Sequence, residues 1–291
     1  MAISMNTRPQ ISAVPPKRPH SRHLSREIGE KALTAAVLFF VMFPILWLIL
    51  TAFKPENEVY TTSFIFKPTL DNFITIFTEP FNNQRLVLNS LIIATTATLI
   101  TVPVALGAAY VFSRYHFRGS QLLMVLVLVT QFIPPLVIAL PFFNLFRRIG
   151  LYDSHAGLVI VYLSIVVPYA IWMLKGFIDA LPIEIEQAAS VDGCTEIGIL
   201  RHITLPLVMP GVITTAVFAF IMCWNEFTYA LILTRNDART LQLGLMSTVG
   251  VRGILWELMA ATGLIVMIPV FILSFSVRKY FVQGLTMGAV K

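Results

Sequence analysis

The chain has 291 residues, of which 57% are hydrophobic and only 12% are charged, and its mean hydropathy is +0.79. Soluble domains carry about 25% charged residues, and one core with a polar shell is enough for a chain of this length. The composition therefore excludes an ordinary soluble fold and predicts a membrane protein. The net charge of +6 is typical of Lys and Arg in cytoplasmic loops rather than of nucleic-acid binding.

The sequence motifs predict no chemistry within this chain. The two cysteines, Cys194 and Cys223, are too few for a disulfide framework, and we interpret both as reduced thiols. No Walker-type loop, HExxH, paired CxxC or GxGxxG pattern occurs in the sequence. We therefore expect no catalytic residue, no metal site and no ATP site here.

The first 31 residues are polar, basic and rich in proline, and they predict a cytoplasmic tail that becomes a short interfacial helix near Ser25. The apolar stretch that follows is too long for a cleavable signal peptide. Six stretches are long enough to cross about 30 Å of hydrocarbon. They are Ala32–Phe53, Leu86–Ser113, Gly119–Phe146, Ser154–Leu174, Val208–Thr234 and Leu258–Val277.

Every predicted span contains a proline, which kinks a transmembrane helix and favours a transporter over a simple anchor. The sequence thus predicts an all-α polytopic membrane protein with six transmembrane helices. We divide it into a tail over residues 1–31, a membrane domain over 32–281 and a C-terminal tail over 282–291. With the N-terminus in the cytoplasm, the inner segments hold 13 Lys and Arg residues and the outer loops hold 8. This bias favours two cytoplasmic termini.

The most polar internal segment, Leu181–Pro206, then lies in the cytoplasm and reads LPIEIEQAASVDGCTEIGILRHITLP. We expect it to form two short helices over residues 182–206, called the hairpin below. Pro182 suits the first turn of the first helix, and Gly193 tolerates the left-handed conformation that ends it. Thr195 caps the second helix, which Pro206 stops.

An apolar stripe is expected along the hairpin, formed by Ala188, Val191, Ile197, Leu200 and Ile203. Two interpretations fit such a stripe. The hairpin either lies on the bilayer surface as an interfacial helix pair, or it fits a groove on a soluble cytoplasmic protein.

The spacing of the hairpin resembles the EAA loop of binding-protein-dependent ABC importers. The matching elements are Gln187-Ala188-Ala189, then Gly193 after three residues, then Ile203-x-Leu205-Pro206 after nine more. This resemblance implies a coupling helix that sits in the cleft of an ATPase subunit. The residues implied in coupling are Glu186, Gln187, Ala188, Ala189, Asp192, Gly193, Ile203, Leu205 and Pro206.

One position departs from that family pattern. The family has Glu where this chain has Gln187, and Glu186 stands one position earlier. The charge is therefore shifted or missing, which weakens a salt-bridge role for position 187. The helix–turn–helix geometry does not depend on it.

Other stretches resemble the carbohydrate importers of the maltose-transporter type, in particular the smaller of their two membrane subunits. They are Gly150–Asp153 followed by Gly157-Leu158, Trp224–Phe227, and Lys279–Lys291. The resemblance covers about residues 30–291. In that family the glycine-rich C-terminal tail reaches toward the ATPase pair, and the alternative here is a frayed terminus.

The resemblance implies a set of partners in a bacterial cytoplasmic membrane. They are a second homologous permease subunit, two ATP-binding-cassette subunits that hold ATP and Mg, an extracytoplasmic solute-binding protein, and a sugar as substrate. This chain itself would bind no cofactor and no nucleic acid.

Glu226 is the one acid deep in a predicted span, and an ionisable residue in a membrane is a candidate for a translocation pathway. The alternatives are a partner for a backbone amide or a place near the outer face. Further pathway candidates are Asn225, Tyr229, Gln131 and Asn89. For Gln131 and Asn89, hydrogen bonding between helices is the favoured interpretation. The aromatic residues Trp172, Tyr169 and Phe220 either stack on a sugar or, as we favour, pack against helices and lipid.

Two other classes of membrane protein compete with this interpretation. An ion-driven secondary transporter would need several buried charges, and no internal repeat supports one. A membrane scaffold would not need a proline in every span. The sequence therefore favours the permease subunit of an ATP-driven importer for a sugar or oligosaccharide, with a non-sugar solute as the alternative.

Overall fold

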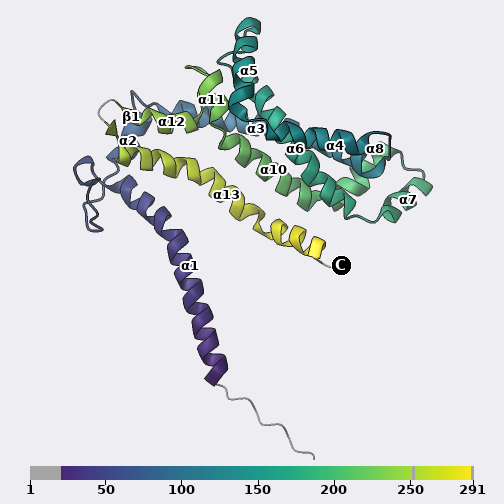
Figure 1. Ribbon diagram of the computed structural model, residues 1–291, viewed down its shortest axis with the longest axis horizontal. Helices are drawn as coiled ribbons and strands as arrows, with labels where there is room; N and C mark the ends of the chain where they lie inside the picture. Colours follow the sequence, from purple (N-terminus) through teal and green to yellow (C-terminus); the bar gives the residue numbers. More distant parts are fainter. Residues whose placement is uncertain (1–20, 251–252, 290–291) are drawn as a thin grey trace, which may run out of the picture. The chain divides into compact units, whose positions relative to one another are not determined.

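The computed structural model describes residues 21–250 and 253–289, and nearly all of its elements are helices (Figure 1). Within that range the single exception is a ribbon of two short antiparallel strands. The predicted all-α polytopic fold is confirmed. The chain divides into two compact units, residues 1–47 and 48–291. Of the tail predicted over residues 1–31, residues 1–20 lie outside the described residues and residues 21–31 form the start of the first helix.

The elements follow one another in this order: α1 Ser21–Phe53, η1 Glu56–Glu58, α2 Asp71–Phe77, α3 Asn83–Arg114, α4 Ser120–Val129, η2 Thr130–Phe132, α5 Pro135–Ile149, α6 His155–Asp179, α7 Ile183–Val191, α8 Glu196–Ile199, the π-helical turn η3 Leu200–Thr204, α9 Leu205–Leu207, α10 Met209–Trp224, α11 Thr228–Leu233, α12 Leu241–Ser247, β1 Val249–Gly250, β2 Gly253–Ile254 and α13 Trp256–Ala289.

Four helices in the described part of the chain are long and apolar enough to cross a membrane: Gly29–Phe53, Asn83–Arg114, His155–Asp179 and Trp256–Arg278. Two bent pairs of helices reach the same length. They are Ser120–Phe132 with Pro135–Ile149, bent by 89°, and Glu196–Leu207 with Met209–Trp224, bent by 79°. Counting each pair as one span gives the predicted six.

The third predicted span, Gly119–Phe146, is not one straight helix. It breaks at Ile133 and Pro134, between η2 and α5. A proline lacks the N–H that continues a helix and disfavours helical backbone in the residue before it. Two consecutive prolines, Pro134 and Pro135, therefore end one helix and start the next.

The fifth predicted span, Val208–Thr234, is also interrupted. The helix α10 ends at Trp224, and α11 begins only at Thr228 after a non-helical segment over residues 225–227. The span begins at the second bend, where Val208 joins α9 to α10. Proline, which suits the first turn of a helix, occupies position 210 just after that bend.

The hairpin forms the two short helices expected, α7 and α8. Gly193 has a φ of +88°, the left-handed conformation predicted at the helix end. The Thr195 hydroxyl accepts the Gly198 N–H at 3.2 Å, which confirms the predicted cap. The prediction that Pro206 stops the second helix was wrong. The helix continues through η3 into α9 because Pro206 occupies the first turn of α9, where its missing N–H costs nothing.

The C-terminal segment differs from a simple tail, since α13 continues to Ala289. Residues 290–291 lie outside the described residues. The core of the larger unit forms where α3, α6 and α10 pack on one another and α13 packs on α10. Tyr162 and Trp224 are almost fully buried there. The Trp224 indole N–H donates to the Val266 carbonyl at 3.0 Å and ties α10 to α13.

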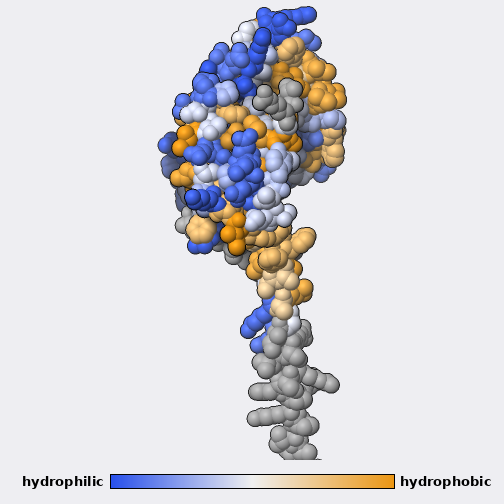
Figure 2. Space-filling model, turned by 90° about the vertical axis from the view of Figure 1, so that its left-hand side faces the viewer, coloured by the Kyte–Doolittle hydropathy of each residue, from blue (hydrophilic) through white to orange (hydrophobic). Residues whose placement is uncertain are grey.

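Seen from the end of this unit that carries α2, α12 and the β1–β2 ribbon, many hydrophilic residues lie on the surface between hydrophobic ones (Figure 2). The sides of the helices instead expose large apolar residues, such as Leu99 on α3 and Ile160 on α6. A polar end and apolar sides are what a membrane-embedded bundle requires.

We predict that Gly157→Ala destabilises the fold. A Cβ at position 157 would lie 2.3 Å from the Leu151 carbonyl oxygen and 3.1 Å from Ser154 Oγ, the atom that caps α6. Overpacking of this kind costs about 1–3 kcal/mol. Gly107→Ala is the control, because nothing lies within 4 Å of a Cβ at that helical position. The melting temperature in detergent should be lowered by Gly157→Ala only. Equal melting temperatures for the two variants would contradict the packing argument.

Candidate functional site

The hairpin exposes apolar side chains at the end of the bundle where α3 and α6 finish. Val191 is 88% exposed and Ile197 is 78% exposed. Ala188 is also exposed, whereas Leu200 and Ile203 are half-buried. A short amphipathic hairpin that leaves large apolar side chains such as Val191 and Ile197 on the surface is typical of a site for a partner.

The structure divides the residues predicted for coupling into three groups. Ile203 and Leu205 are half-buried, and Glu186 and Ala189 are buried. The exposed members are Gln187, Ala188, Asp192, Gly193 and Pro206. Their contacts with a partner stay a prediction, and only the exposed and half-buried members are accessible for such contacts.

Glu186 faces the interior of the protein. Its carboxylate accepts hydrogen bonds from Arg114 Nε at 2.8 Å and Nη2 at 3.2 Å, and from the Thr204 hydroxyl at 2.7 Å. The two charged side chains are 10% and 8% exposed. The acid next to Gln187 is therefore used inside the fold, while Gln187 presents an uncharged amide on the surface.

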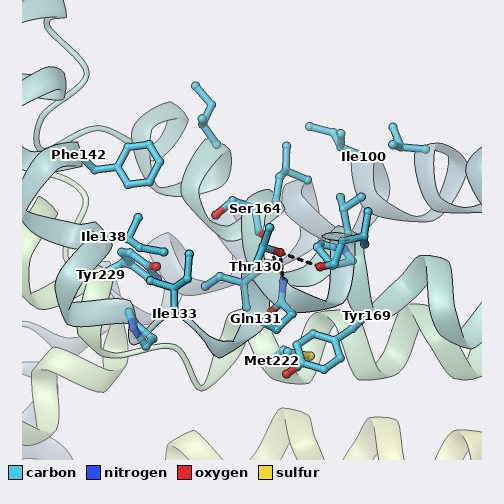
Figure 3. A pocket seen from close by; sticks show the side chains of 18 residues that line it. Ile100, Thr130, Gln131, Ile133, Ile138, Phe142, Ser164, Tyr169, Met222 and Tyr229 are labelled. Atoms are coloured by element: carbon cyan, nitrogen blue, oxygen red, sulfur yellow. Dashed lines mark hydrogen bonds between the residues drawn. The ribbon is translucent and has the colours of Figure 1, made fainter. Parts of the chain in front are cut away.

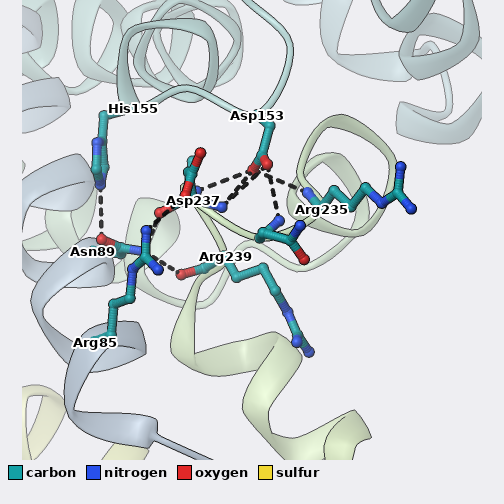
Figure 4. Close-up of polar contacts among 9 residues, drawn as sticks. Arg85, Asn89, Asp153, His155, Arg235, Asp237 and Arg239 are labelled. Atoms are coloured by element: carbon teal, nitrogen blue, oxygen red, sulfur yellow. Dashed lines mark hydrogen bonds and ion pairs between the residues drawn. The ribbon is translucent and has the colours of Figure 1, made fainter.

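At the other end of α3, the Asp153 carboxylate holds the loop between α11 and α12 (Figure 4). It accepts the backbone N–H groups of residues 235, 236, 237 and 238 at 2.9–3.1 Å. Burial alone would raise the pKa of Asp153, but these four N–H groups outweigh it and lower the pKa below its ordinary value of 3.8. The loop is thus built around one carboxylate.

Asn89 fastens the same loop from α3 (Figure 4). Its side-chain amide donates to the carbonyls of Asp237 and Arg239 at 2.8 and 2.9 Å, and its Oδ1 lies 2.8 Å from His155 Nε2. Arg85 forms an ion pair with Asp237 at 2.7 Å. The predicted pathway residue Asn89 is therefore engaged in hydrogen bonds between elements, which is the interpretation favoured from sequence.

A cavity of about 850 Å³ lies beside the break between η2 and α5 (Figure 3). It is lined by two predicted pathway residues, Gln131 and Tyr229, and by Tyr169. Gln131 Nε2 lies 3.5 Å from the Ser164 carbonyl, close enough for a weak hydrogen bond. Most of the other lining side chains are apolar. The cavity therefore combines a few polar atoms with aromatic rings in an apolar wall.

The remaining pathway and aromatic candidates lie elsewhere. Trp172 lines a separate cavity of about 430 Å³, and Phe220 stacks on Trp224 with ring centroids 5.8 Å apart. Asn225 is exposed, and its Oδ1 lies 3.4 Å from Gln242 Nε2. The predicted set thus separates into a group at the cavity and a dispersed group.

Glu226 serves the backbone at the interrupted span. Its carboxylate accepts the N–H of Tyr229 at 3.0 Å and the N–H of Ala230 at 3.2 Å. It therefore caps the first turn of α11, which matches the alternative in which it partners a backbone amide. A role in translocation stays a prediction.

Sequence reasoning missed Arg114 and His155 and noted Asp153 only as part of a family stretch. The only indication in the sequence is that each of these polar residues stands next to a long apolar segment. Their partners, 66 to 85 residues away in the chain, gave no such signal. Within residues 21–250 and 253–289, no three His, Cys, Asp or Glu side chains are grouped to hold a metal ion.

Comparisons with known proteins place this architecture among transporters. The family described as the binding-protein-dependent transport system inner membrane component matches residues 101–287. The diacetylchitobiose uptake system permease protein DasC of Streptomyces coelicolor is 33% identical over 264 residues, which cover 89% of this chain and 95% of that protein. The trehalose/maltose transport system permease protein MalG of Thermococcus litoralis is 33% identical over 254 residues, with 86% and 91% covered.

A solved structure has the same fold. It is a bacterial ABC transporter involved in the import of the acidic polysaccharide alginate, one chain of which superposes with a TM-score of 0.73. The two chains are 20% identical, and 91% of this chain and 99% of that chain are covered.

We predict that Asp153→Ala loosens the loop over residues 234–240, because four N–H groups lose their acceptor. Hydrogen exchange in that loop should accelerate by about tenfold or more, since exchange reports local opening. The control is Asp71→Ala, which removes an acid outside this loop. An unchanged exchange rate in the Asp153 variant would refute the assignment.

The same contact fixes the direction of a pH effect. The pKa of Asp153 is lowered in the folded protein, so its contribution is complete above 3.8 and is lost as pH falls through the folded value. In the unmodified protein, the protection of the loop should therefore stay constant between about pH 5 and 8 once intrinsic exchange is corrected.

Glu226→Ala should destabilise the interrupted span, because loss of a helix cap costs about 1 kcal/mol. Glu226→Gln keeps one acceptor oxygen, so its melting temperature should lie between those of the unmodified protein and Glu226→Ala. Thermal unfolding measures the effect on the fold, and uptake at equal expression measures transport. Wild-type melting together with lost uptake in both variants would favour a pathway role over the cap.

Proposed function

This chain belongs to the family of binding-protein-dependent transport system inner membrane components, and we propose that it couples ATP hydrolysis on partner subunits to import of a sugar or oligosaccharide. It is a permease subunit of an ABC transporter. The observation that carries the coupling role is the hairpin, which presents Val191 and Ile197 to solvent while Glu186 holds it from inside.

The proposed partners follow from that surface and from the family. Two soluble ATP-binding-cassette subunits hold ATP and Mg, and one of them receives the exposed face of the hairpin. A second homologous permease subunit completes the membrane-spanning unit, and a solute-binding protein delivers the substrate outside the cell. This chain contributes no catalytic residue and binds no cofactor.

The proposed motion begins at the ATPase subunits. When ATP closes their cleft, the hairpin moves with them, and the helices rock between inward-facing and outward-facing states. The helices α3 and α6 reach the base of the hairpin, and both also contribute lining residues to the 850 Å³ cavity, such as Ile100 and Ser164. A displacement of the hairpin therefore has a direct path to the cavity wall.

A sugar is the proposed substrate class because one relative belongs to a diacetylchitobiose uptake system and another to a trehalose/maltose transport system. The cavity supports this choice, since Tyr169, Tyr229 and Gln131 all contribute to its lining. We propose that the protein lies in the bacterial cytoplasmic membrane with both termini in the cytoplasm, which the distribution of Lys and Arg favours.

The test is co-purification after substitution of the exposed apolar face. Val191→Asp combined with Ile197→Asp should reduce the ATPase recovered with this chain by about tenfold, because buried charges at an interface core are costly. Ile65→Asp is the matched control, since Ile65 is 90% exposed and lies outside the hairpin. Equal ATPase recovery in all three proteins would refute docking at the hairpin.

A second measurement tests whether ATP hydrolysis belongs to the partner subunits and which sugar is the substrate. The chain purified alone should not hydrolyse ATP, whereas the assembled complex should. Diacetylchitobiose, maltose and trehalose are the first sugars to compare, by stimulation of that hydrolysis in the presence of the binding protein. Turnover by the isolated chain would contradict the proposal.

A further inference from the structure

Three consecutive residues at the end of α3, Ser113, Arg114 and Tyr115, contact three different elements at the base of the hairpin. We call them the α3 clamp. We propose that the clamp joins the hairpin to α3 as one moving body, with Arg114 as the positioning residue for energy coupling. This inference rests on the proposed function.

Arg114 makes the central contact. Its guanidinium binds both oxygens of Glu186 on α7, and Nη2 also donates to the carbonyls of Ile178 and Leu181 at 3.0 and 3.3 Å. These two carbonyls belong to the end of α6 and to the link to α7, and the Ile178 carbonyl also accepts the Leu181 N–H at 3.0 Å. One side chain therefore fixes α7 to α6 as well as to α3.

The ion pair is shielded from water, with side-chain exposures of 10% for Arg114 and 8% for Glu186. A pair of this kind is retained only when its geometry is good and its remaining hydrogen bonds are satisfied. The remaining bond comes from the Thr204 hydroxyl, which is fully buried in η3 and donates to Glu186 at 2.7 Å. The pair thus also holds the far side of the hairpin.

The two neighbours of Arg114 extend the contact in both directions. The Ser113 hydroxyl donates to Asp179 at the end of α6 at 2.6 Å. The Glu196 carboxylate is the main cause that raises the pKa of the neighbouring Tyr115 to about 12. Since Glu196 is the first residue of α8, the clamp reaches both short helices of the hairpin.

The position of the clamp on α3 gives it a role beyond local stability. The helix α3 runs without interruption for 32 residues, from Asn83 to Arg114. It lines the 850 Å³ cavity through Ile100 and Val104 and holds the α11–α12 loop through Asn89. A force applied at Val191 or Ile197 would therefore reach the cavity and the opposite end of the bundle through one helix.

The experiment uses the complete complex in lipid nanodiscs, with Cys194 replaced by Ser. Spin labels at Ser190→Cys on α7 and Val111→Cys on α3 report the distance between the two elements. Both sites are exposed. The distance distribution is measured without nucleotide and after trapping with ADP–vanadate, and ATP hydrolysis is measured in parallel.

In the otherwise unmodified complex, the distribution should be narrow and the same in both states. Arg114→Met should broaden it and should lower hydrolysis by about tenfold, within the usual range of coupling between sites. Arg114→Lys keeps the charge but not the planar fork, so its effect should be intermediate. Arg118→Met is the matched control, because Arg118 is an exposed arginine in the link that follows α3, and it should change neither quantity.

Two further variants cover the case in which Arg114→Met fails to fold. Tyr115→Phe removes only the hydroxyl that interacts with Glu196 and should broaden the distribution slightly. The exchange of Arg114→Glu with Glu186→Arg should restore part of the narrow distribution lost in either single variant. The clamp proposal would be overturned if Arg114→Met showed the distances and the hydrolysis of the unmodified complex. It would also be overturned if Tyr115→Phe showed them and the exchange of Arg114 and Glu186 restored nothing. Either outcome would leave the proposed function standing. Absence of an ATPase from the unmodified complex would overturn the proposed function as well.

Discussion

The structure depends on one requirement of the membrane, that backbone N–H and C=O groups released at a helix end must find partners within the protein. The polar side chains of this chain mostly meet that requirement. Arg114 binds two carbonyls, one in the last turn of α6 and one in the link to α7. Asn89 binds two carbonyls of the α11–α12 loop, and Glu226 binds N–H groups of α11. Asp153 alone accepts four backbone N–H groups. Each of these four side chains therefore satisfies backbone groups at a helix end or in a loop.

This requirement explains why the two ends of α3 are built differently from its middle. The middle of α3 meets lipid or neighbouring helices and needs no side-chain hydrogen bonds across elements. Its first turns and its last turn each meet an irregular segment, and there Asn89 and Arg114 make several contacts at once. A long helix that is held at both ends is stiff along its axis. The helix α3 is therefore suited to transmit a displacement from one irregular segment to the other.

The sequence predicted what depends on local or average properties. Composition predicted the membrane class, and the residue types at Gly193 and Thr195 predicted the turn and cap of the hairpin. Two local predictions failed, at residues 225–227 and at Pro206, because proline and cap residues show that a break can occur but not whether the helix continues past it. The inward position of Glu186 depends on Arg114, which is 72 residues away, and periodicity carries no information at that distance.

The π-helical turn at Leu200–Thr204 gives a physical reason for the fixed length of the segment between Gly193 and Pro206. A wide turn holds one residue more than an α-helical turn, and each residue rotates the chain by about 100°. Removing one residue would tighten the turn and rotate Thr204 away from the Glu186 carboxylate, which it now meets at 2.7 Å. The spacing of the motif therefore determines the direction in which the Thr204 side chain points. A chain that lacked one residue of this segment would point the buried hydroxyl of Thr204 in another direction.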